Sequence, residues 1–140
     1  MARSAAKIVA AIRAFEPADG NWRPLDDLFA ELWSTGEAKL QIPALFSVLE
    51  RFPEEDGAGV LWSVVHGLES LPDYEPELVR SVQRQPSELA VTMIGRLLNG
   101  GISKVGATDL VSLLQSVAAH AEVPARVREI ARDFAADYAA

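Results

Sequence analysis

Apolar side chains recur at steps of three and four residues along nearly the whole chain. This spacing is typical of helices that bury one face, and no run alternates between apolar and polar positions as a half-buried strand does. The pattern predicts eight helices, which begin near residues 4, 23, 43, 60, 77, 87, 108 and 124. The fold class expected from the sequence is therefore all-α.

Local signals mark where these helices begin and end. The cluster of Pro and Gly at residues 17–20 ends the first helix, and the two prolines of residues 71–76 form a turn, because proline disfavours helical backbone in the residue before it. Ser87 and Thr108 are expected to cap the sixth and seventh helices through their side-chain oxygens. The Asn-Gly-Gly run at residues 99–101 supplies the left-handed residues with which helices commonly end.

The helices also form pairs. Three segments share an apolar pattern at offsets of 33 and 32 residues, namely residues 44–49, 77–82 and 109–114, and each opens a helix that a second helix follows. Such a spacing is typical of two-helix repeats. The sequence therefore predicts a single domain of about eight helices stacked as antiparallel hairpins, a HEAT-like α-solenoid, with residues 1–36 as a capping pair and residues 37–140 as the repeats. An irregular helical bundle is the alternative.

Composition narrows the class of protein further. With 140 residues, 49% of them hydrophobic and 24% charged, the chain can form one compact domain and is not disordered. It has no cysteine, which excludes disulfides and suits a reducing compartment. Lys7 and Arg13 interrupt the first apolar run, so it reads as an amphipathic helix rather than a signal peptide, and no segment approaches the roughly 20 apolar residues of a membrane span. We therefore expect a cytoplasmic protein that does not bind a membrane.

Negative charge is concentrated in residues 54–77. This window contains seven carboxylates and no Lys or Arg, whereas the thirteen acids outside it equal the thirteen bases, so the window accounts for the whole net charge of −7. Binding to nucleic acid is not expected at a pI near 4.8, because such binding relies on Lys and Arg. An acidic surface favours basic partners instead.

The predicted helix in the middle of this window has three different faces. Its apolar stripe, which should face the core, consists of Val60, Leu61, Val64, Val65 and Leu68. A second face has small residues that would let a neighbouring backbone come close, namely Ser63, Gly67 and Ser70. The third face carries Trp62, His66, Glu69 and Asp73. Because carboxylates are not buried without paired bases, we expect this third face to be partly exposed. For Trp62 two interpretations stay open: a core side chain, as aromatic residues on helices usually are, or a hot spot for a partner.

Catalytic and metal sites find little support in the same residues. His66 and Glu69 are three residues apart on a helix and could reach one metal ion, with Asp73 or Asp56 as a further ligand. A di-iron bundle needs two Glu-x-x-His pairs, however, and His120 is the only other histidine. The chain also has no nucleophile elbow and no phosphate loop. We therefore predict no catalytic residue, no metal and no cofactor.

Three segments carry a resemblance to a known family: residues 52–57 (FPEEDG), 61–69 (LWSVVHGLE) and 96–101 (RLLNGG). They resemble small all-helical immunity proteins of bacterial polymorphic toxin and contact-dependent growth inhibition systems. The likeness covers roughly residues 43–105. It implies that the chain binds one toxin domain tightly, often a nuclease, and neutralises it.

Charge and resemblance thus predict the same kind of partner. A nuclease must attract phosphates and so carries a basic cleft, which an inhibitor can occupy with carboxylates. We expect a monomer that forms a 1:1 complex with such a toxin. The residues expected to contact it are Glu54, Glu55, Asp56, Trp62, His66, Glu69, Asp73, Tyr74, Glu75 and Glu77. The alternative is a helical-repeat adaptor that binds a basic segment of another cellular protein.

Overall fold

The computed structural model describes residues 3–139, and eight α-helices form almost all of its regular structure. They are α1 (Ala5–Ala14), α2 (Arg23–Ser34), α3 (Ile42–Arg51), α4 (Val60–Glu69), α5 (Glu75–Arg84), α6 (Glu88–Asn99), α7 (Leu110–Ala119) and α8 (Ala125–Tyr138). Two short 3-10 helices, η1 (Ala38–Gln41) and η2 (Gly57–Gly59), precede α3 and α4. Within residues 3–139, no helix combines the length and the apolar character that crossing a membrane requires.

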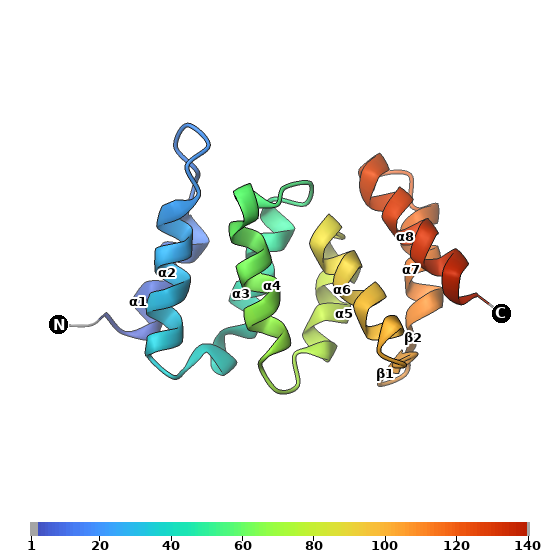
Figure 1. Ribbon diagram of the computed structural model, residues 1–140, viewed down its shortest axis with the longest axis horizontal. Coiled ribbons are helices and arrows are strands. Elements are labelled where there is room, and N and C mark those ends of the chain that lie inside the picture. Colours follow the sequence, from blue (N-terminus) through green and yellow to red (C-terminus); the bar gives the residue numbers. More distant parts are fainter. Residues whose placement is uncertain (1–2, 140) are drawn as a thin grey trace.

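Successive helices pair as antiparallel hairpins that stand side by side in a row (Figure 1). Helices α1, α3 and α5 contact one another in sequence along one layer, and α2, α4, α6 and α8 do so along the other. The first hairpin and the last lie at opposite ends of the row. The all-α fold of stacked hairpins predicted from the apolar pattern is confirmed.

The three repeated segments occupy equivalent places in this stack. They lie in α3, in α5 and at the start of α7, each the first helix of its hairpin. Leu45, Leu78 and Leu110, which match one another in the repeat, are all fully buried. The shared apolar pattern therefore reflects a shared packing position.

An aromatic cluster fixes the loop between α3 and α4. The ring of Trp22 lies 5.8 Å from Phe15 and 4.9 Å from Phe52, centroid to centroid. Gly57 packs against the same indole so closely that a Cβ there would lie 2.9 Å from it, and its φ of +59° also favours glycine. This loop, which carries three of the acidic residues, is thus anchored to the core.

Two glycines let aromatic rings sit directly on a helix backbone. A Cβ on Gly67 of α4 would lie 2.5 Å from the ring of Trp33, and one on Gly95 of α6 would lie 2.4 Å from the ring of Phe134. The close approach predicted at Gly67 is confirmed, but a side chain makes it rather than a backbone. Ser63 and Ser70 are exposed, so the predicted line of contact along the small residues is wrong for both.

Most predicted helix ends agree with the structure. The side chain of Ser87 accepts a hydrogen bond from the amide of Ala90, and left-handed Gly101 ends α6 with the amide of Ile102 bonded to the carbonyl of Leu97. The cap of α7 is Asp109, however, and not Thr108. Thr108 instead lies in a two-residue strand, β2 (Thr108–Asp109), which pairs with β1 (Lys104–Val105) in a hairpin that the pattern did not predict.

Candidate partner-binding surface

The seven carboxylates of residues 54–77 divide into two clusters at opposite ends of α4 (Figure 1). The first three lie in the loop that precedes the helix, and the other four lie at its last residue or in the turn and helix that follow. Ten helical residues span about 15 Å. The acidic window is therefore not one continuous patch.

Arginines from outside the window neutralise part of the second cluster. The guanidinium of Arg96 donates two hydrogen bonds to Glu69, of 2.8 and 3.0 Å. Glu77 accepts from Arg80 at 3.0 Å and from Arg84 at 2.9 Å. Burial alone would raise the pKa of Glu77, but these two guanidiniums outweigh it and lower that pKa. Glu69 and Glu77 thus stabilise the fold and are less available to a partner than their sequence suggests.

The turn between α4 and α5 presents one further acid and buries its aromatic. Asp73 is exposed, with a φ of 59°, whereas Glu75 is half-buried. Tyr74 is only 8% exposed and belongs to the core. Burial, with Glu75 and Glu69 nearby, raises the pKa of its phenol. Tyr74 therefore offers little surface for the contact that the sequence predicts for it.

The first cluster is fully presented to solvent. Glu54, Glu55 and Asp56 are exposed, and none of them forms a salt bridge within residues 3–139. Asp56 accepts a hydrogen bond of 3.1 Å from the amide of Ala58, and the carbonyl of Pro53 accepts one of 2.8 Å from the amide of Glu88 on α6. These bonds hold the backbone of the loop and the carboxylate of Asp56 in place.

Beside this loop is a groove of about 440 Å³, here called the acidic groove. It is lined by the loop and by α4, α6 and α8, through Glu54, Glu55, Asp56, Trp62, Glu88, Leu89, Thr92, Arg126 and Ile130. Trp62 is half-buried and packs against the core, with its ring 6.0 Å from that of His66. Burial raises the pKa of Glu88, and the three loop carboxylates add to this effect while Arg126 opposes it.

The sequence did not indicate the part of the groove that α6 and α8 supply. Glu88 and Arg126 are more than 25 residues from the loop they meet, and each stands in a mixed run of charged and apolar residues typical of any surface helix. Only the stacking of α4, α6 and α8 brings them together.

A metal site does not assemble around His66. Its Nδ1 lies 4.0 Å from Oε1 of Glu69, and Glu69 is already bound by Arg96. Asp56 and Asp73 lie beyond opposite ends of α4. No cluster of three potential metal ligands occurs within residues 3–139.

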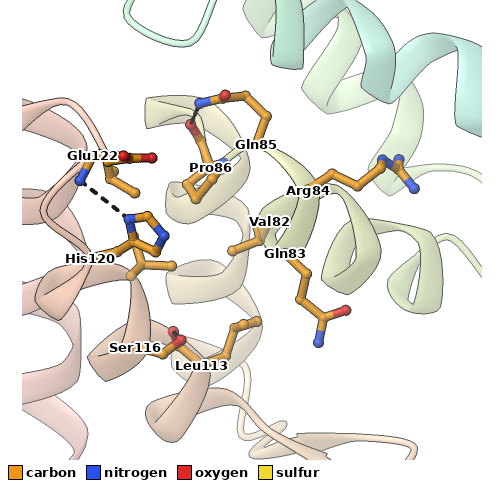
Figure 2. A pocket seen from close by; sticks show the side chains of 11 residues that line it. Val82, Gln83, Arg84, Gln85, Pro86, Leu113, Ser116, His120 and Glu122 are labelled. Atoms are coloured by element: carbon orange, nitrogen blue, oxygen red, sulfur yellow. Dashed lines mark hydrogen bonds between the residues drawn. The ribbon is translucent and has the colours of Figure 1, made fainter.

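A second groove, of about 410 Å³, lies between α5 and α7 (Figure 2). Two of its polar side chains bond to the backbone: Nδ1 of His120 accepts from the amide of Glu122 at 3.3 Å, and Gln85 donates to the carbonyl of Pro86 at 3.2 Å. Arg84 points away from His120 toward Glu50 and Glu77. Within residues 3–139, no salt bridge joins His120 to Glu122, the acid that also lines this groove.

Comparisons of the chain with models of protein families, with curated protein sequences and with solved structures found no match. The function proposed below is therefore argued chiefly from the geometry of the acidic groove.

Proposed function

We propose that this chain is a binding protein that neutralises a basic protein toxin, as immunity proteins do, by placing the acidic groove against it. One observation carries the proposal: three exposed carboxylates without a salt bridge to any described residue border a half-buried tryptophan. The three carboxylates would occupy the positions in a nuclease cleft that the phosphates of its substrate otherwise take. The resemblance of residues 52–57 and 61–69 to immunity proteins supports the same partner.

The arrangement suits fast and tight association. Exposed charges of one sign raise association rates above the roughly 10⁵ to 10⁶ M⁻¹s⁻¹ of neutral pairs. An indole beside them adds apolar area and a hydrogen-bond donor, the usual chemistry of a hot spot. Both features lie on a loop and a helix that the core already holds, so little ordering is needed on binding.

The test uses a cloned candidate toxin domain, which should be the product of the neighbouring gene. The double variant Glu54→Lys/Glu55→Lys should slow association with that domain about tenfold or more, because each change places a like charge at a cationic cleft. The matched control is Asp133→Lys/Asp137→Lys, which changes the net charge equally at exposed positions of α8 outside the groove. Equal slowing by both double variants would contradict the proposal.

The alternative is an adaptor for a basic segment of another cellular protein. A row of stacked hairpins favours it, because such rows commonly bind extended segments. Co-expression separates the two functions: an immunity protein protects cells that make the toxin domain, and an adaptor does not.

A further inference from the structure

A guanidinium of the chain itself already lies at the acidic groove. Arg126, near the start of α8, lines it. Its Nε is 3.8 Å from Oε1 of Glu88, which is beyond hydrogen-bonding distance, and its Nη1 is 3.3 Å from Oε1 of Glu129. The side chain remains 57% exposed. Arg126 is therefore close to the groove carboxylates but only loosely held by them.

The groove has more negative charge than this one guanidinium balances. Glu54, Glu55, Asp56 and Glu88 supply four carboxylates against one arginine. The side chain of Glu88 is 25% exposed, so a cation that reached it would be partly shielded from water. Opposite charge and an open volume together favour a cationic occupant.

The indole of Trp62, which lines the groove, favours a planar cation. Within residues 3–139 the cation–π contact of an arginine is made elsewhere, by Arg51 over the ring of Phe52 at 4.9 Å, and Trp62 has none. A guanidinium can stack on an indole and bind a carboxylate through two parallel hydrogen bonds, whereas an ammonium is a compact, strongly hydrated charge.

We propose that the acidic groove accepts an arginine side chain of the partner, which stacks on Trp62 and binds Glu88, and that Arg126 competes with it for the same carboxylate. This inference rests on the proposed function and specifies its recognition chemistry. The guanidinium of the partner displaces that of Arg126, which stays bound to Glu129 or turns into solvent. Arg126 thereby lowers the apparent affinity of the groove for any cation that binds Glu88, arginine included.

The probes are two capped peptides of equal charge, Gly-Arg-Gly-Arg-Gly and Gly-Lys-Gly-Lys-Gly. Binding to the whole chain is measured by calorimetry and through the indole N–H signal of Trp62 in nitrogen-15 NMR, assigned with Trp62→Phe. The arginine peptide should bind about three- to tenfold more tightly than the lysine peptide. Arg126→Gln should tighten binding of the arginine peptide about threefold, because the internal competitor is gone.

The matched control is Arg132→Gln, which removes the same charge from an exposed position of α8 that does not line the groove. Equal affinities for the two peptides, or equal tightening by both Gln variants, would overturn the inference. If Glu54→Lys/Glu55→Lys still slowed toxin association in that case, the proposed function would stand without an arginine site. If neither peptide moved the Trp62 signal and that double variant had no effect on the toxin, both proposals would fail.

Discussion

At the scale of single residues, the two helix glycines under aromatic rings are the positions least tolerant of added volume. Gly95→Ala would place a methyl group 2.4 Å from the ring of Phe134, so the ring or the helix must shift. We expect a loss of about 1 to 3 kcal/mol in the free energy of unfolding, although alanine is the better helix former by about 1 kcal/mol. Urea denaturation measures this. Gly100→Ala is the control, because its Cβ would meet only ordinary contacts, at 3.5 Å and beyond, and a change as large there would contradict the packing argument.

The small residues of α4 make a second comparison. Gly67→Leu should lower the melting temperature because Trp33 occupies the space above it, whereas Ser63→Leu should leave it nearly unchanged because Ser63 is exposed. Thermal denaturation of the two variants provides the test. Similar losses in both would mean that the neighbouring hairpin covers both positions.

Ser63 and Gly67 also show that a pattern of residue types does not determine which positions of a helix face a neighbouring helix covers. The apolar stripe predicted for α4 is buried except at Val60, which is half-buried, and of the predicted small-residue face only Gly67 is closely covered. Which part of the small face is covered depends on where α2 crosses α4, and that crossing is set by residues more than 25 positions away.

At the scale of elements, a polar network joins α3 to α5. Ser81 is fully buried and donates to Glu50 at 2.9 Å, and Arg84 donates to both Glu50 and Glu77. The equivalent positions of Ser81 in the other two repeats are Val48 and Leu113. The contact between these two hairpins therefore includes a polar network at a position where the other two repeats bury an apolar side chain.

This network predicts a dependence of stability on pH. The pKa of Glu77 is lower in the folded chain than its usual value of 4.5, so its ionised form stabilises the fold above that value and the contribution is lost as pH falls through the folded pKa. Glu77→Gln should therefore reduce the melting temperature at pH 7 and should reduce it less at pH 3. Calorimetry across that range checks this, and a difference that stayed constant with pH would contradict it.

Helix boundaries were largely predictable because Ser, Pro and Gly act within a few residues of where they stand. Ser87 caps α6 as predicted, the chain turns through left-handed Asp19 and Gly20 after α1, and of residues 99–101 only Gly101 is left-handed. The β1–β2 hairpin was missed because two-residue strands are too short to alternate. The burial of Tyr74 and the pairing of Glu69 with Arg96 were missed because both depend on helices that are remote in sequence.

At the scale of the whole molecule, a row of hairpins predicts unequal local stability. Each inner hairpin packs against two neighbours, and each end hairpin packs against one. In such stacks the free energy of unfolding is approximately the sum of the intrinsic stability of each repeat and the stability of each interface between neighbouring repeats. Native-state hydrogen exchange should therefore show the strongest amide protection in α3 to α6 and earlier exchange in the two end hairpins, α1 with α2 and α7 with α8. Uniform protection across all four hairpins would indicate a single cooperative core instead.

Because α4 lies between the two acidic clusters of residues 54–77, it fixes the separation between them. Helix α4, about 15 Å long, separates the loop that carries Glu54 from the turn that carries Asp73, and one added helical turn would move the loop and the turn apart by a further 5.4 Å or so. A rigid partner that engages both ends must carry its cations at a matching interval. Two partners with equal total charge but different spacing between their cationic groups would then bind with different affinities. Charge would determine the rate of association, and the length of α4 would determine which partner dissociates slowly.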